Sequence, residues 1–177
     1  ARRELFTGAF SPTHGDRVFN ETLRMPALPT MAQVFRNAGY QAFAVGKMHV
    51  YPQRDRIGFD DVILNEEGRH HLGAGADDFE LYLAEQGFAG QELTHALCNN
   101  DFMTRPWHLP ERCHPTNWTA REMCKAIKRR DPTRPAFWYC SFNHPHPPLV
   151  PLAEYMDLYR RDDFDMPFVG GPRRFEA

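Results

Sequence analysis

Lys47 and His49 stand two residues apart in the stretch Gly46-Lys47-Met48-His49, which directly follows the apolar run 42–45, typical of a buried strand. A lysine ammonium can hold an anion, and a histidine can transfer protons near neutral pH. His146 has a similar place, because it follows the apolar and aromatic run 136–142. In open α/β sheets, ligands bind beyond the carboxyl ends of the strands. We therefore expect Lys47, His49 and His146 to face one pocket.

Arg2 adds another cation to this predicted pocket. It lies in the first turn of a short helical segment, residues 2–7, where free backbone N–H groups and the helix dipole favour an anion. An arginine adds a bidentate donor that suits a tetrahedral oxyanion. Together with Lys47, His49 and His146, it makes an electropositive site in a chain of net charge −2. This combination points to a sulfate or phosphate group.

Each of these residues also has a simpler interpretation. A lysine at a strand end is usually a solvated charge, Arg2 beside Arg3 is typical of a surface pair, and His146 between prolines can cap a turn. His144 and His146 also have the spacing of two metal ligands, but a metal site needs further partners. The sequence alone leaves these alternatives open.

The composition indicates a folded protein. A chain of 177 residues with 42% hydrophobic residues is long enough for one domain with a substantial core. The net charge of −2 gives no reason to expect nucleic acid or an anionic membrane as a partner. The four cysteines have no CxxC spacing, which does not favour a zinc site. We expect free thiols, with Cys124 and Cys140 in the core, which favours a reducing compartment.

Two helix–strand units predict a parallel sheet. Thr30 and Gln33 form a capping box before a helix that leads into strand 41–45, and Thr119 and Glu122 repeat the pattern before strand 136–142. A helix that feeds a short apolar strand is typical of α/β repeats. The remaining predictions are a loop over residues 51–76, a helix over 77–86, no assignment for 88–117, and a last helix from Pro151 with Tyr155 and Tyr159 facing inward.

A series of motifs along nearly the whole chain resembles the sulfatase family of the alkaline-phosphatase superfamily. Gly46-Lys47-Met48-His49 resembles the family's GK-x-H, and residues 141–148, Ser-Phe-Asn-His-Pro-His-Pro-Pro, resemble its SF-x-x-PH-x-P. The two motifs in this order are far more specific than either alone. The other matching segments are Arg2-x-x-Leu5-x-Thr7-Gly8, His14-Gly15, Pro29-Thr30-Met31-Ala32, Ala38-Gly39-Tyr40 and Gly58-Phe59-Asp60.

The resemblance implies an α/β/α sandwich with a mostly parallel central sheet, incomplete in this chain, and makes residues 1–177 part of a single catalytic domain. It implies a formylglycine whose hydrated aldehyde attacks the sulfur of a small-molecule sulfate ester. Arg2 would help to hold that aldehyde, and Lys47 would bridge it and the sulfate. His49 would be a hydrogen-bond partner and candidate base. His146 would contact the sulfate and help to protonate the leaving oxygen.

The family's other catalytic parts are expected outside this chain. The residue that becomes formylglycine would lie just upstream of Ala1, and the carboxylates that bind a divalent cation, most simply Ca²⁺, have no counterpart here. The chain alone is therefore not expected to turn over. Alternatives are a phosphonate monoester or phosphodiester hydrolase of the same superfamily, a non-catalytic anion-binding module, and a metal-binding protein centred on His144 and His146.

Overall fold

The computed structural model of this chain describes residues 2–18, 20–73, 75–159, 165 and 170. Within this part, three parallel strands form an open sheet in the order β2-β1-β3. They are β1 (Gln41–Gly46), β2 (Asp61–Leu64) and β3 (Ala136–Ser141). The predicted parallel sheet is confirmed, but β2 falls in the segment that was predicted to be loop. Four residues that begin with an exposed aspartate carry too little periodicity to indicate a strand.

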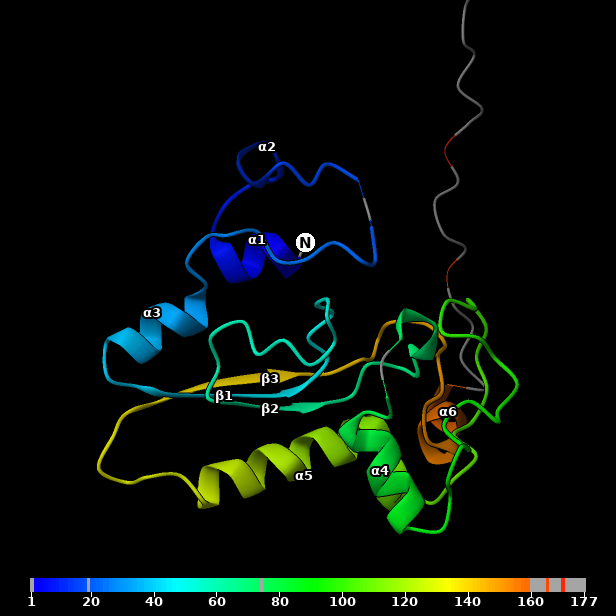
Figure 1. Ribbon diagram of the computed structural model, residues 1–177. Helices are drawn as coiled ribbons and strands as arrows, with labels where there is room; N and C mark the ends of the chain where they lie inside the picture. The colour runs from blue at the N-terminus through cyan, green and yellow to red at the C-terminus, as the bar shows by residue number, and fades with distance from the viewer. Residues whose placement is uncertain (1, 19, 74, 160–164, 166–169, 171–177) are drawn as a thin grey trace, which may run out of the picture.

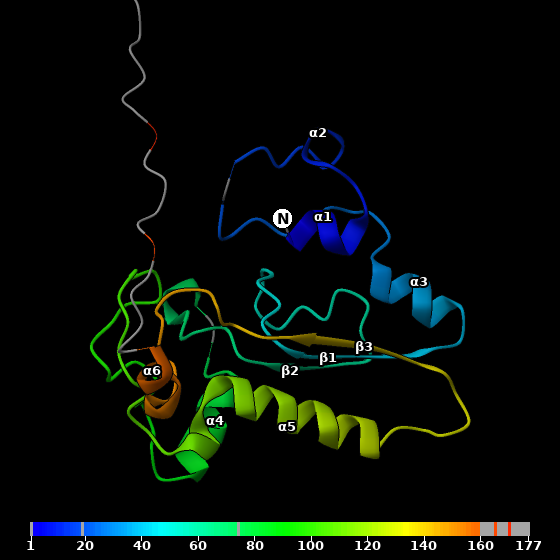
Figure 2. The same cartoon turned by 180° about the vertical axis from the view of Figure 1, so that it is seen from behind.

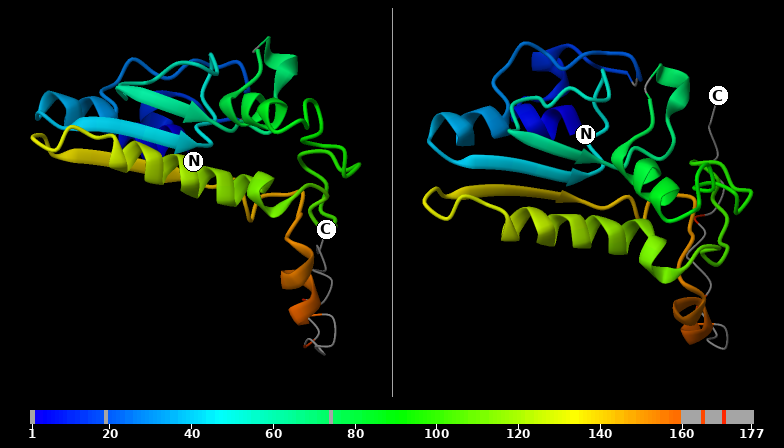
Figure 3. Two further views of the ribbon diagram at one scale, coloured as in Figure 1. Left: turned by 90° about the horizontal axis from the view of Figure 1, so that it is seen from below. Right: turned by 60° about the horizontal axis from the view of Figure 1, so that its bottom comes forward.

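Helices cover both faces of the sheet (Figures 1 and 2), so the predicted α/β sandwich is confirmed. One face carries the amino-terminal helices, and α4 and α5 lie against the other, with α5 running along the strands (Figure 3). α6 lies near the carboxyl ends of the strands. The helices are α1 (Arg2–Thr7), α2 (Ser11–His14), α3 (Met31–Asn37), α4 (Asp78–Glu85), α5 (Pro115–Lys128) and α6 (Ala153–Tyr159), with short 3-10 helices η1 (His70–Leu72) and η2 (Glu111–Cys113).

The alternation of side chains along the strands divides the core into two parts. Ala42 and Ala44 of β1 pack with Phe6 of α1 and Phe59 on one face of the sheet. Phe43 belongs to the other face and stacks on Trp138 of β3, with 5.3 Å between the ring centroids. A second buried cluster, around Phe79, Leu83, Trp118 and Leu152, joins α4 and α5 to the segment before α6. Within the described residues, no helix is long and apolar enough to span a membrane.

The predicted helix starts are confirmed at α3 and wrong at α5. Thr30 and Gln33 make both hydrogen bonds of a capping box. α5 begins at Pro115 instead, because the His114 side chain accepts a hydrogen bond from the Thr116 backbone N–H and proline suits the first turn. This earlier start leaves Thr119 buried in the middle of the helix.

Two predictions about side-chain burial also differ from the structure. The cysteines are free as expected, but Cys124 and Cys140 are exposed, and only Cys113 is buried. α6 begins at Ala153 rather than Pro151, and its Tyr155 and Tyr159 are exposed. The patterns were correct for a helix or strand, but Cys140 lies in β3, an edge strand of the described sheet, and no described element covers Cys124 or the two tyrosines of α6.

Gly46 ends β1 in a conformation that excludes any other residue, and Gly46→Ala is expected to destabilise the protein strongly. Its φ is +100°, and a Cβ atom there would lie 1.9 Å from the backbone oxygen of Ser141. Because the obstacle is backbone, relief requires β1 and β3 to separate, which we expect to cost more than about 3 kcal/mol. Thermal unfolding of the intact protein measures this.

Gly39→Ala is the matched control for this change. Gly39 has a similar φ of +88°, but a Cβ atom there would meet no atom within 4 Å in the described part of the chain, its own neighbours in sequence aside. Gly39→Ala should therefore lower the free energy of unfolding only by the cost of an alanine in the left-handed conformation, about 1 kcal/mol. Equal losses for the two variants would contradict the steric explanation.

Candidate active site

The parallel register brings three chain segments to one edge of the sheet. Gly46 pairs with Leu64 of β2 and with Ser141 of β3, so the three strands end side by side. The Lys47 backbone N–H donates to the Ser141 oxygen at 3.0 Å, and the Asn65 N–H donates to the Gly46 oxygen at 3.2 Å. The segments 47–49, 65–69 and 143–146 therefore leave the sheet next to one another.

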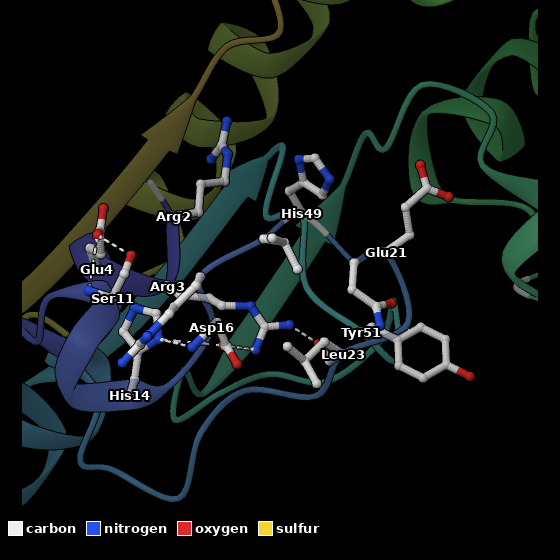
Figure 4. A pocket seen from close by; sticks show the side chains of 13 residues that line it. Arg2, Arg3, Glu4, Ser11, His14, Asp16, Glu21, Leu23, His49 and Tyr51 are labelled. Atoms are coloured by element: carbon white, nitrogen blue, oxygen red, sulfur yellow. Dashed lines mark hydrogen bonds and ion pairs between the residues drawn. The ribbon is translucent and has the colours of Figure 1, made fainter.

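Arg2 ties α1 to this edge. Its Nη1 atom donates to the Lys47 backbone oxygen at 2.7 Å, to Tyr139 Oη at 2.9 Å and to Ser141 Oγ at 3.0 Å. The guanidinium thus holds the ends of β1 and β3 together under the first turn of α1. Figure 4 shows Arg2 and His49 together on the wall of one pocket.

Lys47 is almost completely buried, at 3% exposure. Its Nζ lies 2.5 Å from Oε2 of Glu67, which is also buried. Burial lowers the pKa of Lys47, and the adjacent carboxylate of Glu67 opposes that shift. The ammonium is therefore held in the interior by one carboxylate.

His49 is held at both its backbone and its ring. Oε1 of Glu66 accepts from the backbone N–H groups of Met48 at 2.6 Å and His49 at 2.8 Å. The ring Nε2 lies 3.0 Å from Nη1 of Arg69. Arginine can only donate, so Nε2 must be the acceptor and the ring is neutral. Burial lowers the pKa of His49 to about 4, and the charges of Arg69, Lys47 and Arg2 act in the same direction.

His146 is more accessible, with 41% of its side chain exposed. Its Nδ1 lies 2.7 Å from the Pro147 backbone oxygen, so this nitrogen carries a proton, and 3.7 Å from Oε1 of Glu67. Nε2 is then the nitrogen that can exchange a proton with a ligand. Glu67 therefore lies between His146 and Lys47.

The structure brings Arg2, Lys47, His49 and His146, all singled out from the sequence, to the same edge of the sheet, but the predicted single pocket is not seen: Arg2 and His49 line one cavity, His146 lines another, and Lys47 is buried. Their catalytic roles stay predictions. Sequence reasoning missed Glu66, Glu67 and Arg69, which connect them. These residues follow β2, so the rule that selected Lys47 and His146 would have selected them too, had β2 been recognised.

A cavity of about 450 Å³ lies between α1, α2 and His49 (Figure 4). This volume is within the range of small-molecule sites, about 300–1,000 Å³. His14, part of the His14-Gly15 segment that resembles the family, lines it, and its Nδ1 accepts from the Asp16 N–H at 3.1 Å. The cavity places Arg2 and His49 where a ligand can reach them.

The sequence model of the sulfatase family matches residues 1–166. The chain belongs to the sulfatase family. An arylsulfatase of Clostridium perfringens (strain 13 / Type A) is 33% identical to it over 181 aligned residues, which cover 96% of this chain and 38% of the relative. This sulfatase chain thus spans well under half the length of that protein.

Solved structures agree on the fold. BT4656, determined in complex with its substrate D-glucosamine-2-N,6-O-disulfate, has a TM-score of 0.59 at 18% identity, covering 94% of this chain and 28% of that one. The phosphonate monoester hydrolase of Agrobacterium radiobacter has a TM-score of 0.57 at 18% identity, covering 89% of this chain and 33% of that one. At this level of identity, the likeness concerns the fold of the sulfatase chain.

The metal ion implied by the sulfatase resemblance has no fitting site in the described part of this chain. No group of three or more His, Cys, Asp or Glu side chains is placed there to hold an ion. His144, one of the two histidines with ligand spacing, stacks on His114 instead, with 5.2 Å between the ring centroids.

His144 gives this sulfatase a testable pH dependence. Burial lowers its pKa to about 4, so the folded protein binds fewer protons at this site than the unfolded chain does between about pH 6.5 and 4. The wild type should therefore lose stability relative to a His144→Gln variant as the pH falls through that range. Melting temperatures of the two intact proteins, measured at each pH, check this.

The quantity to follow is the difference in melting temperature between the wild type and His144→Gln at each pH. The pKa of Asp77 is raised to about 6 by burial, so its protonation stabilises the folded state over part of the same range and masks the effect in the wild type alone. Asp77 is common to both proteins and cancels. A difference that stays constant from pH 7 to about 4 would contradict a depressed pKa at His144.

Proposed function

We propose that the intact protein hydrolyses a small-molecule sulfate ester, and that residues 1–177 are part of its single catalytic domain. The observation that carries this proposal is the 33% identity to an arylsulfatase over 96% of the chain. The gathering of Lys47, Arg69, His49 and His146 at one sheet edge supports it, because the cations Lys47 and Arg69 can stabilise the charge on the non-bridging oxygens of an ester, and the histidines can hydrogen-bond to it.

Each residue has a role that suits its surroundings. Lys47, a buried ammonium, binds a charged oxygen of the ester and stabilises it in the transition state. His146 contacts the same group and protonates the leaving oxygen from Nε2. His49 is neutral and can act as a hydrogen-bond partner or base. Arg2 keeps the ends of β1 and β3 in register beneath the site.

We further propose that residues outside this chain provide the formylglycine nucleophile and the ligands of a divalent cation, most simply Ca²⁺. The support is membership of the sulfatase family. A peptide map of the intact protein, after reaction with a hydrazide that labels aldehydes, tests the nucleophile. Absence of a labelled peptide in active protein would exclude it.

The nearest alternative is hydrolysis of a phosphonate monoester or phosphodiester. It is supported by the TM-scores of 0.57 and 0.59 to phosphonate monoester hydrolases. The deciding experiment compares kcat/KM of the intact protein for 4-nitrophenyl sulfate, a 4-nitrophenyl phosphonate monoester and a 4-nitrophenyl phosphodiester. A preference for the sulfate supports the proposal, and a preference for either phosphorus ester replaces it. Saturable sulfate binding with no turnover of any ester would indicate a non-catalytic anion-binding protein.

A further inference from the structure

The carboxylate of Glu67 lies among the side chains of Lys47, Arg69 and His146. Its Oε2 is 2.5 Å from Nζ of Lys47 and 3.7 Å from Nη2 of Arg69, and its Oε1 is 3.7 Å from Nδ1 of His146. The side chains of Lys47, Arg69 and Glu67 are each less than a tenth exposed. Glu67 therefore contacts, from the interior, Lys47 and His146, which the proposed function assigns to the substrate, and also Arg69.

These contacts cannot coexist with a bound ester. The ammonium has three N–H donors, but its side chain is only 4% exposed, and the Glu67 carboxylate lies between it and both Arg69 and His146. An ester oxygen that Lys47 binds together with these two residues must therefore take the position now held by Glu67 Oε2. Two anions held by one buried ammonium would also repel each other strongly in a low-dielectric site. Binding therefore requires the Glu67 side chain to move.

The surroundings of Glu67 allow that movement. Glu67 has a φ of +60°, which is unfavourable for a residue with a side chain, and it precedes Gly68, whose φ is +63°. It also lines a second cavity of about 510 Å³, together with Gly68, His71 and Leu93. The ion pairs hold the residue in its present position, and space is available on its other side.

Arg69 has binding capacity that its present contacts do not use. Its Nε is buried without a hydrogen-bond partner in the described part of the chain. Its charge is shared only loosely, with Glu67 at 3.7 Å and Glu21 at 3.8 Å. A guanidinium with spare donors is suited to the oxygens of a tetrahedral anion.

We propose that Glu67 is an internal anion that occupies the charge site of the free enzyme, and that Arg69 becomes a ligand of the substrate's anionic group when Glu67 moves away. This rests on the proposed function, since it uses the same site. Glu67 keeps the buried ammonium of Lys47 neutralised until a substrate arrives, and it competes with that substrate. Arg69 joins Lys47 and His146 in holding the anion.

The test uses inorganic sulfate as the probe. Glu67→Gln keeps the size of the side chain and removes its charge, so the Kd of the intact protein for sulfate should fall at least tenfold, measured by calorimetry. Without sulfate the variant should melt below the wild type, because the buried Lys47 ammonium has lost its counter-charge. Sulfate should then raise the melting temperature of the variant more than that of the wild type. Adding Arg69→Gln to this variant should reverse the gain in affinity.

Glu92→Gln is the matched control. Glu92 is a nearby glutamate of intermediate exposure whose pKa is raised by burial, and the ion pairs of Lys47, Arg69 and His146 in the described part of the chain are with other residues. Its sulfate affinity should equal that of the wild type. If Glu67→Gln does not fold, Glu67→Asp, which draws the charge back by one methylene, should still lower the Kd at least threefold.

The outcomes separate this proposal from the proposed function. Unchanged or weaker sulfate binding in the folded Glu67 variants would show a purely structural ion pair and overturn the inference, whatever the wild-type activity. An unchanged Kd on adding Arg69→Gln would overturn the role of Arg69. Tighter sulfate binding in Glu67→Gln, with no ester hydrolysed by the wild type, would leave the inference standing and remove the proposed function.

Discussion

Replacing Lys47 by methionine in the intact protein is expected to lower kcat/KM for an aryl sulfate by about a thousandfold or more. The ammonium lies in a buried site, where one charge stabilises the developing negative charge of the transition state far better than it would in water. Methionine fills a similar volume without the charge. Initial rates over a range of substrate concentrations give kcat and KM separately.

The double variant Lys47→Met/Glu67→Gln separates catalysis from stability. Lys47→Met alone leaves the buried Glu67 carboxylate without its nearest partner and should lower the melting temperature. Removing both charges should restore much of that stability without restoring the rate. Lys128→Ala, an exposed position at the end of α5, is the control for loss of a lysine and should behave as wild type. Wild-type rates in Lys47→Met would refute the site assignment.

The part of the site that follows β1 and β3 could be predicted from the sequence, because both strands are apolar runs that end abruptly in polar residues. Lys47, His49 and His146 each lie within five residues of the end of such a run. Gly46, the last residue of β1, pairs with Ser141 at the end of β3, and a side chain there would meet the Ser141 backbone.

The part that follows β2 could not be predicted. A segment containing Glu66, Glu67 and Arg69 has the composition of a solvated loop, and only pairing of the short β2 strand with β1 draws it into the interior. Nothing local in the sequence indicates that these charges neutralise one another. The prediction of where α5 begins was wrong for a related reason. The Thr119–Glu122 pattern fits a helix start, but His114 and Pro115 provide an earlier one.

His146→Ala in the intact protein is expected to reduce kcat/KM by an amount that depends on the leaving group. A general acid typically contributes about 10²–10⁴-fold, and its contribution grows as the leaving oxygen becomes more basic. Unsubstituted phenyl sulfate should therefore lose at least about a hundredfold, and 4-nitrophenyl sulfate, whose leaving group departs readily without a proton, about tenfold or less. Measuring kcat/KM of the wild type and of His146→Ala on both substrates gives the ratio of the two losses directly.

That ratio distinguishes proton donation from simple binding. If His146 only holds the anion, both esters lose the same factor, because both carry the same sulfate group. His71→Ala is a suitable control, since His71 is an exposed histidine that pairs with Glu21 at 2.8 Å and should leave both rates unchanged. The 3.7 Å contact of His146 with Glu67 adds a further expectation: Glu67→Gln should not abolish the leaving-group dependence, because the proton is donated by His146. If His146→Ala lowers kcat/KM for the two esters by nearly the same factor while Glu67 is intact, His146 is an anion ligand and not a general acid.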